Sequence, residues 1–320
     1  MSVTDGQRPL GPDGAADSIG RAAEPPTKYL SASAHLTRSM QFVRYSDGSE
    51  PAWGVQTDAG IHALAARPAG EPSYQDLTNG SYLDGIESDV EDGALPVVDP
   101  DDVDVLAPVP QPGKIVCAGL NYHDHAEEQD EEVPERPLLF GKAGTSVTNP
   151  GDPIVDPAEI EELDFEVERG VVIGRRATDV DEGEVDDYVA GYTVINDVSG
   201  RDAQMSDGQF FRGKSYDTFA PMGPTLVAGE EFDPNAVDVE LRVNGETKQS
   251  SNTEEFIFDV HELVSYISDD MTLEPGDVIS TGTPGGVGIF REPVDLLEPG
   301  DSCEAEIEGI GTLENPVVEE

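Results

Sequence analysis

The chain has 320 residues, of which 37% are hydrophobic, and this is enough to bury a substantial core. Its 67 acidic and 18 basic residues give a formal net charge of -49, which argues against nucleic acids and anionic membranes as partners because both bind clustered basic side chains. No apolar run approaches the roughly 20 residues of a membrane span, and the N-terminal residues lack a signal-peptide pattern, so we expect a cytoplasmic protein.

Composition divides the chain into three parts. Residues 1–39 are rich in Gly, Pro, Ala, Ser and Asp without helical or strand periodicity, which predicts a disordered N-terminal extension. Met40 opens a strand-like run and is a candidate for the true start of the protein. Short strand-like segments alternate with Gly and Asp turns over 40–106, which predicts a small β-rich domain, and an acidic, Pro-rich stretch separates it from a main domain over 113–320.

The main domain shows mostly strand and turn signals. Pro-Gly-Asp occurs three times and predicts tight turns, and Asn244-Gly245 predicts a type I′ hairpin. One helix is predicted after Asp259 as N-cap. Cys117 and Cys303 lie in apolar segments and are expected to be buried free thiols. The predicted strands lie at 171–173, 192–195, 237–243 and 278–280.

The acidic residues are spread along the whole chain, and only five residues are lysines. This distribution is typical of proteins from halophiles. At molar salt the Debye length falls to about 3 Å, so repulsion is screened and the acidic surface keeps the protein hydrated. We therefore attribute the charge to habitat and look for function elsewhere.

Three carboxylates are candidates for a metal site. Glu166 and Glu168 are two residues apart in a strand-like segment and should project from one face. Asp197 follows the predicted strand 192–195. Clustered carboxylates repel one another unless a cation holds them, and oxygen ligands suit Mg²⁺ or Mn²⁺. In so acidic a chain this pattern also fits a solvated strand face, which Asp164 would share.

Two further groups are candidates for catalysis. His125 and Glu128 are three residues apart, so on a helix they would meet and could form an oriented general base. A surface histidine in an acidic helix fits the same pattern. Lys214 lies beside aromatic residues and could polarise a carbonyl group, although an ordinary salt bridge is equally compatible.

A glycine-rich loop begins at Thr281 but lacks the Gly-Lys-Ser/Thr ending of a phosphate-binding loop, so we exclude a nucleotide site there. This loop and four other motifs resemble, in order and spacing, the fumarylacetoacetate hydrolase family over about residues 114–318. The motifs are Asn121-Tyr-His-Asp-His, Glu166-Val-Glu168, Asn196-Asp197-Val-Ser-Gly-Arg201-Asp, Gly213-Lys214 and Gly282-Thr-Pro-Gly-Gly-Val-Gly.

The resemblance implies a mixed, β-rich α+β fold, with a β-roll catalytic domain and a small N-terminal β-rich unit, assembled as a homodimer. It implies that Glu166, Glu168 and Asp197 hold Mg²⁺ or Mn²⁺. It also implies a catalytic dyad of His125 and Glu128 on a lid. The residues expected to face the substrate are Arg201, Gln204, Lys214 and Thr283.

The resemblance further implies a small 2-oxo acid substrate. The branch that it favours includes acylpyruvate and fumarylpyruvate hydrolases, so hydrolysis of a carbon–carbon bond is our first expectation. The same branch includes 2-hydroxyhepta-2,4-diene-1,7-dioate isomerases and oxaloacetate tautomerases, and decarboxylation also remains open. A 2-keto-3-deoxy sugar acid dehydratase ranks lower. The non-enzyme alternative is a metabolite-binding relative, which would show degraded motifs.

Overall fold

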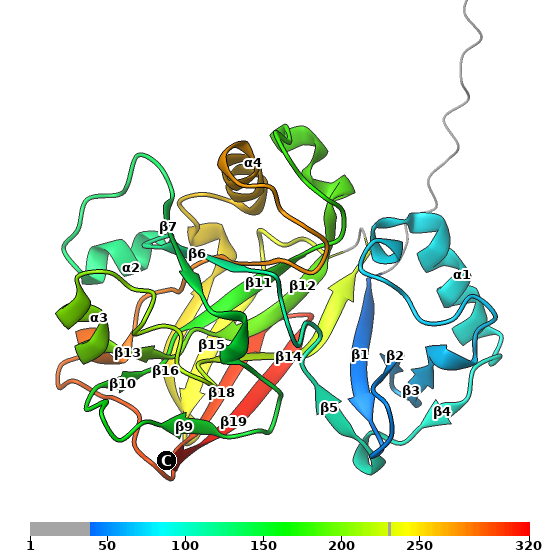
Figure 1. The fold of residues 1–320 in the computed structure, drawn as a ribbon, viewed down its shortest axis with the longest axis horizontal. Helices are drawn as coiled ribbons and strands as arrows, with labels where there is room; N and C mark the ends of the chain where they lie inside the picture. The colour runs from blue at the N-terminus through cyan, green and yellow to red at the C-terminus, as the bar shows by residue number, and fades with distance from the viewer. Residues whose placement is uncertain (1–38, 230–231) are drawn as a thin grey trace, which may run out of the picture. The chain divides into compact units, whose positions relative to one another are not determined.

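The computed structural model describes residues 39–229 and 232–320 (Figure 1). The fold is mixed α+β and rich in strands, as expected. The predicted extension lies, up to residue 38, outside the described residues, and the assignment of Met40 as the true start remains a prediction. No helix in the described part of the chain is long and apolar enough to cross a membrane.

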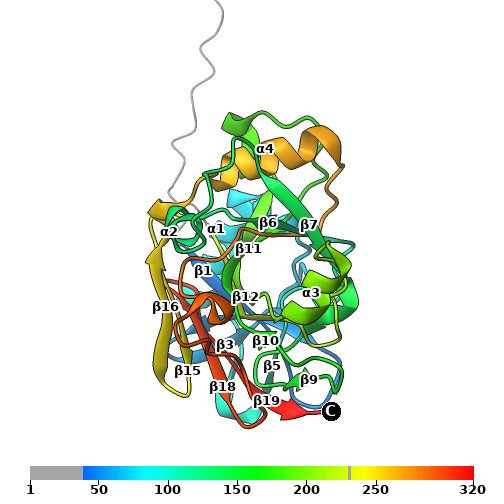
Figure 2. The ribbon, with the colours of Figure 1, turned by 90° about the vertical axis from the view of Figure 1, so that its left-hand side faces the viewer.

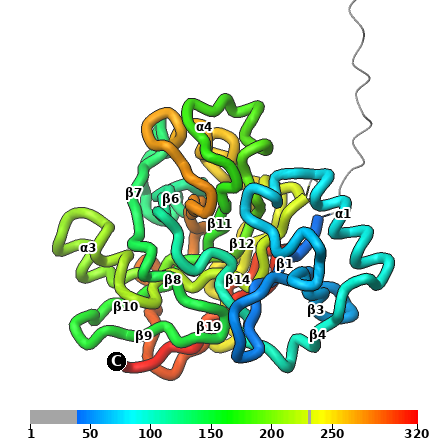
Figure 3. The backbone as a smooth tube through the Cα atoms, turned by 45° about the vertical axis from the view of Figure 1, so that its right-hand side comes forward, coloured from blue at the N-terminus to red at the C-terminus, as the bar shows by residue number. Residues whose placement is uncertain are grey.

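The largest sheet among the described residues has 12 strands and contains segments from both sides of the predicted boundary at 106–113. β1 pairs antiparallel with β14, so the N-terminal strands continue the sheet of the main domain (Figure 3). The order is β4-β3-β2-β1-β14-β12-β11-β17-β6-β7, with β5 beside β1 and β8 beside β14. These strands are β1 (Met40–Ser46), β2 (Ala52–Thr57), β3 (Gly60–Ala63), β4 (Val97–Val98), β5 (Asp104–Leu106), β6 (Ile115–Gly119), β7 (Leu138–Lys142), β8 (Val147–Thr148), β11 (Val167–Ile173), β12 (Val189–Asn196), β14 (Ala220–Ala228) and β17 (Val278–Ser280).

A second sheet has five strands in the order β16-β15-β18-β19-β9. Its strands are β9 (Ile154–Asp156), β15 (Asp238–Val243), β16 (Glu246–Asn252), β18 (Ser302–Ile307) and β19 (Gly311–Glu319). A short pair joins β10 (Leu163–Asp164) to β13 (Ser199–Gly200). The helices are α1 (Gly80–Glu91), α2 (His123–Glu128), α3 (Arg201–Asp207) and α4 (Val260–Asp270). Figure 2 shows α2 and α3 on opposite sides of β11 and β12.

The core is built around β11 and β12, in which every residue is buried. β15 and β18 of the second sheet contact β11, and their apolar residues belong to one core cluster with most of those of β11 and β12. Strands that are covered on both faces form a rigid support, because side chains in a close-packed interior have few alternative positions. The candidate site lies where β11 begins and β12 ends.

Most local predictions for the main domain are confirmed. Asn244 and Gly245 have positive φ and join β15 to β16, and the glycines of the three Pro-Gly-Asp turns also have positive φ. Asp259 caps α4 through a capping box, and both cysteines are buried and free. The sequence analysis did not predict α1 or α3. Only Leu83 and Ile86 are buried in α1, which leaves a weak apolar stripe, and α3 has only seven residues.

Candidate active site

The three predicted carboxylates converge at the ends of β11 and β12. The two strands pair antiparallel, so Glu168 lies opposite Ile195 and Asp197 emerges one residue after β12 ends. The backbone N–H of Asp197 donates to the carbonyl oxygen of Glu166 at 2.8 Å, which fixes these two residues relative to each other. Exposure is 5% for Glu166, 2% for Glu168 and 0% for Asp197, so the alternative of a solvated strand face is wrong for these residues.

Buried cations neutralise two of the three carboxylates. Lys214 Nζ lies 2.6 Å from Glu166 Oε2 and 2.9 Å from Asp197 Oδ2. Lys142 Nζ donates to Asp197 at 2.5 Å, and Arg201 Nη2 donates to Glu166 at 2.5 Å. Burial alone would raise the pKa of Glu166, but Lys214 and Arg201 outweigh burial and hold that pKa at about 2. Glu166 is therefore ionised at neutral pH.

Glu168 differs from its two neighbours because no described cation lies within ion-pair distance of it. Its carboxylate accepts hydrogen bonds from Ser280 Oγ at 2.5 Å and from the backbone N–H of Gly282 at 3.0 Å. Burial, followed by the charges of Asp197 and Glu166, raises its pKa to about 8. Additional positive charge is required to keep Glu168 ionised at neutral pH.

The carboxylate triad fits a divalent cation. One oxygen from each residue lies within 4.8 Å of the others, and all three side chains are buried. An all-oxygen donor set of this kind suits a hard ion such as Mg²⁺ or Mn²⁺. Glu168, which has no cation partner among the described residues, is the carboxylate that such an ion would stabilise most. Glu166, Glu168 and Asp197 would hold it, while Lys142 and Arg201 keep two of them in position.

The His125–Glu128 contact is formed on α2. His125 Nδ1 lies 2.6 Å from Glu128 Oε1, and Gln129 Nε2 lies 2.8 Å from His125 Nε2. An ionised Glu128 accepts only, so Nδ1 carries the proton and Nε2 accepts from the Gln129 amide. His125 is 6% exposed, so the alternative of a surface histidine is wrong. The imidazole is thus held in one orientation, with Nδ1 toward Glu128 and Nε2 toward Gln129.

The glycine-rich loop links the dyad to the carboxylates. Gly286 donates its N–H to Glu128 Oε2 at 2.8 Å, and Gly282 donates to Glu168. Both glycines have positive φ, and an added Cβ would lie 2.3 Å from the Lys248 carbonyl oxygen at Gly286 and 2.8 Å from Asn121 Cβ at Gly282. A residue with a side chain at either position would therefore displace the loop. This steric requirement accounts for the two glycines, and a role in phosphate binding is not needed to explain them.

One cavity of about 310 Å³ brings most of the predicted residues together. Its lining includes His125, Glu166, Glu168, Arg201, Gln204, Lys214 and Thr283. Asp197 lies behind Lys214, and Glu128 lies behind His125. The Thr283 hydroxyl donates to the Val167 carbonyl at 3.0 Å and accepts from Gln249, so it is held in one orientation. Lys214 makes ion pairs and also faces the cavity. Both interpretations of this lysine therefore fit, as a salt-bridge partner and as a group that polarises a substrate carbonyl.

The sequence analysis missed several supporting residues. Lys142 was noted only as one of five lysines, yet it is completely buried against Asp197. Asp164 was placed on the same strand face as the two glutamates, but it lies in β10, outside the triad, and accepts from Arg201 Nε at 2.8 Å. Gln129 was not assigned a role. No local sequence pattern predicts these contacts. The partners of Lys142 and Asp164 are remote in sequence, and Gln129 lies at the end of a helix with no feature that marks it.

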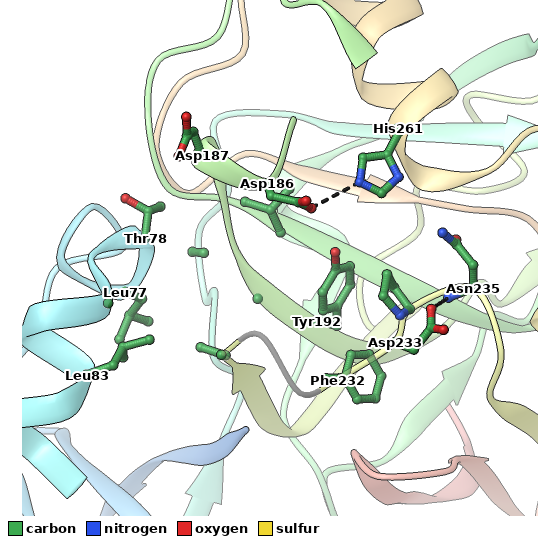
Figure 4. A pocket seen from close by; sticks show the side chains of 17 residues that line it. Leu77, Thr78, Leu83, Asp186, Asp187, Tyr192, Phe232, Asp233, Asn235 and His261 are labelled. Carbon is green, nitrogen blue, oxygen red and sulfur yellow. Dashed lines mark hydrogen bonds and ion pairs between the residues drawn. The ribbon is translucent and has the colours of Figure 1, made fainter. Parts of the chain in front are cut away.

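A larger cavity, of about 580 Å³, lies away from the carboxylates (Figure 4). It includes Asp186, Asp187 and Asp233, and His261 Nε2 lies 3.0 Å from Asp186 Oδ1. None of the predicted site residues lines it. The cavity that holds the predicted site residues is therefore not the larger of the two.

Residues 114–318 match the family described as fumarylacetoacetate (FAA) hydrolase C-terminal, which is more than half of the chain. The chain belongs to the fumarylacetoacetate hydrolase family. An oxaloacetate tautomerase of rat mitochondria (Rattus norvegicus) is 46% identical over 226 residues, which cover 70% of this chain and 72% of the relative.

Two solved structures of family members extend the comparison. A fumarylacetoacetate hydrolase from Exiguobacterium antarcticum is 38% identical with a TM-score of 0.78, and the match covers 88% of this chain and 100% of that one. A 2-hydroxyhepta-2,4-diene-1,7-dioate isomerase from Mycobacterium marinum is 35% identical with a TM-score of 0.70, covering 88% and 99%. The family and the fold agree, while the names of the relatives divide between hydrolase and isomerase or tautomerase chemistry.

The raised pKa of Glu168 predicts how this family member responds to pH when a chelator is present. Between its ordinary pKa of 4.5 and its folded value of about 8, the folded state keeps a proton that the unfolded state has released. The free energy of unfolding should therefore fall as pH rises through this window, by on the order of a few kcal/mol. Denaturant titrations of chelator-treated protein in molar KCl measure this. The neutral variant Glu168→Gln should flatten the slope, and an unchanged slope would contradict the assignment.

Proposed function

We propose that this chain is a divalent-metal-dependent enzyme that interconverts the enol and keto forms of a small 2-oxo acid. The observation that carries the proposal is the cavity itself, which is lined by an oriented histidine and by Glu166 and Glu168, two of the three buried carboxylates that lie together. A proton acceptor beside a site for a hard cation is what enolisation next to a carbonyl group requires. The tautomerase and isomerase names of the relatives support the same chemistry.

The bound metal would supply Lewis-acid polarisation of the 2-oxo group. Lys214 Nζ, next to Glu166 and Asp197, would stabilise negative charge on the substrate oxygen. The amide NH2 group of Gln204 would orient the carboxylate of the substrate, and Thr283, whose hydroxyl is fixed by Val167 and Gln249, would contact the substrate from the cavity wall. In enol-to-keto conversion the enol loses its O–H proton, C3 gains a proton and the C2–C3 double bond becomes a C2–O double bond. Composition is unchanged, so one base that takes and returns a proton is sufficient.

His125 would move this proton. Glu128 keeps Nδ1 protonated, and the Gln129 amide that now donates to Nε2 must give way to the substrate. Aromatic and aliphatic residues form much of the remaining wall of the cavity. These residues are Leu120, Leu138, Phe140, Phe210 and Phe290.

Hydrolysis of a carbon–carbon bond is the second candidate, and it was our first expectation from the sequence. The 38% identity to a fumarylacetoacetate hydrolase favours it. The same histidine would then take a proton from water that attacks a second carbonyl group. The comparisons support the two reactions about equally.

Turnover measurements separate these reactions. We would assay the protein in molar KCl with Mg²⁺, with and without chelator, on oxaloacetate, acylpyruvates and 2-keto-3-deoxy sugar acids. Chelator-sensitive loss of enol absorbance without cleavage is the expected result. Release of pyruvate from an acylpyruvate would instead establish the hydrolase. No chelator-sensitive change with any of these acids would contradict the whole proposal.

The remaining parts of the proposal concern the protein's surroundings. We infer a homodimer in the cytoplasm of a salt-adapted cell, on the basis of the family resemblance and the net charge of -49. Light scattering on the protein at molar and at low KCl checks both the oligomeric state and the need for salt. A monomer at molar KCl would overturn the first inference.

A further inference from the structure

The helix that carries the proposed base, α2, is fixed at its start and followed by exposed residues. The side chain of Asn121, which is 1% exposed, donates to the carbonyl oxygens of Phe258 at 3.0 Å and Thr281 at 2.8 Å. It also accepts from the backbone N–H of Phe258 at 2.9 Å. Residues 130–133, shortly after the helix ends, are exposed. The position of His125 therefore depends on the contacts that α2 itself makes.

Asp124, the residue before His125, makes such contacts with both of its carboxylate oxygens. Oδ1 accepts from the backbone N–H of Gly285 at 3.1 Å, and Oδ2 accepts from Ser251 Oγ at 2.6 Å. Ser251 belongs to β16, which Figure 2 shows beside α2. Gly285 lies close to the helix, because an added Cβ would be 3.3 Å from the Asp124 carbonyl oxygen. Asp124 does not line the catalytic cavity, so any influence on the reaction passes through its neighbours.

The glycine-rich loop that contacts Asp124 also contacts two other carboxylates of the site. Three backbone N–H groups of this loop each donate to one carboxylate, and such charge-assisted hydrogen bonds are stronger than those between neutral groups. The three pairs are Gly282 with Glu168, Gly285 with Asp124 and Gly286 with Glu128. One of these carboxylates belongs to the triad and the other two belong to α2. The loop therefore sets the position of the base helix relative to a predicted metal ligand.

The loop is itself held in place by Gln249, which is completely buried. Gln249 Nε2 donates to Thr283 Oγ1 at 2.8 Å and to the Pro284 carbonyl oxygen at 2.9 Å. Its Oε1 accepts at 2.9 Å from the backbone N–H of Val167, which lies between the two glutamates of the triad. Gln249 and Ser251 are both residues of β16, so one strand supports the loop and Asp124 together.

Glu128 alone is a weaker support for the helix. One of its carboxylate oxygens lies 2.6 Å from His125 Nδ1, and the other accepts from the backbone N–H of Gly286 at 2.8 Å. Without Asp124, this single bond from Glu128 would join the acidic side chains of α2 to the loop, and any shift of the helix would also move the imidazole. Reaction rates are sensitive to such shifts, since a displacement of about 1 Å can lower a rate by about 10²-fold.

We propose that Asp124 is a positioning residue for His125, because it fixes α2 to the glycine-rich loop and to β16. Asp124 keeps the base at a constant distance from the carboxylate triad and takes no part in the proton transfer. The inference rests on the proposed function, in which His125 moves the proton. The sequence analysis gave Asp124 no role, and its two partners lie 161 and 127 positions away in the chain.

Replacement of Asp124 by alanine tests the inference, with Glu127→Ala as the matched control. Glu127 is an exposed glutamate of the same helix whose side chain has no hydrogen-bond partner among the described residues, so both variants lose one negative charge. With the 2-oxo acid that the parent protein converts fastest, Asp124→Ala should lower kcat by about 10- to 100-fold, with KM and Mg²⁺ affinity nearly unchanged. Glu127→Ala should keep the parent kcat. Asp124→Asn should recover most of the loss, because its amide can accept from Gly285 and donate to Ser251.

Hydrogen exchange in molar KCl gives a second readout that does not depend on turnover. In Asp124→Ala the backbone amides of residues 123–129 should exchange at least about tenfold faster than in the parent protein, while those of β11 and β12 keep their protection. Ser251→Ala removes one of the two hydrogen bonds and leaves the charge in place, so it should show the same changes to a smaller degree.

The outcomes separate this inference from the proposed function. An unchanged kcat in Asp124→Ala would overturn the role of Asp124 and leave the proposed function standing, whether or not exchange in α2 becomes faster. An equal loss of kcat in Glu127→Ala would also overturn it, because the charge of the helix and not the contact would then decide. No chelator-sensitive turnover of any 2-oxo acid by the parent protein would overturn both.

Discussion

Replacing Glu168 by glutamine is expected to abolish Mg²⁺ binding and to lower turnover of any 2-oxo acid by on the order of 10³-fold. Glu168 is the carboxylate of the triad that lacks a cation partner among the described residues, so the metal has its strongest electrostatic reason to bind there. Glutamine keeps the shape and can still accept from Ser280 and Gly282. The fold should therefore survive, and calorimetric titration with Mg²⁺ together with the enol assay measures both losses.

A matched control is Glu255→Gln, which removes one negative charge from an exposed glutamate remote in sequence from the site. This variant should bind Mg²⁺ and turn over substrate like the parent protein. Near-normal activity of Glu168→Gln would show that the triad does not hold the catalytic metal. Loss of activity in both variants would point to a general effect of surface charge on the assay.

The sequence predicted the triad because its signal is local. Glu166 and Glu168 are two residues apart and Asp197 follows a strand, so alternation and strand ends make them candidates, and the family resemblance favoured them over a solvated strand face. Alternation alone also included Asp164, and this was wrong because the strand is interrupted: Asp164 lies in β10, which pairs with β13, whereas Glu168 lies in β11. A short break in strand pairing changes the direction in which a side chain points, while the alternation of acidic and apolar residues in the sequence stays the same.

Long-range partners could not be predicted in the same way. Lys142 meets Asp197 across 55 positions of sequence, and nothing around Gly141 and Lys142 distinguishes a buried lysine from an exposed one. Arg169 is a further case, since it is completely buried with its guanidinium carbon 4.7 Å from the centre of the Phe256 ring. A charged residue in a strand normally indicates a solvated face. Only the tertiary structure shows where these charges lie.

Replacing His125 by asparagine is expected to lower kcat by about 10²- to 10⁴-fold while leaving Mg²⁺ affinity unchanged, because the loss falls on proton transfer and not on metal binding. The carboxylates keep their own partners, Lys142, Lys214 and Arg201, none of which contacts His125. Glu128→Gln should cost less, since the base remains and only its orientation and tautomer are weakened. Kinetics of the enol assay with parallel Mg²⁺ titrations check both expectations.

His261→Asn is the matched control, since His261 pairs with Asp186 beside the larger cavity and should be dispensable for turnover. If His125→Asn kept its kcat, the base would have to be another group of the cavity. If it lost Mg²⁺ binding together with activity, α2 would be a structural support of the metal site. The expected pattern, with kcat reduced, metal bound and His261→Asn fully active, assigns the proton to His125 Nε2.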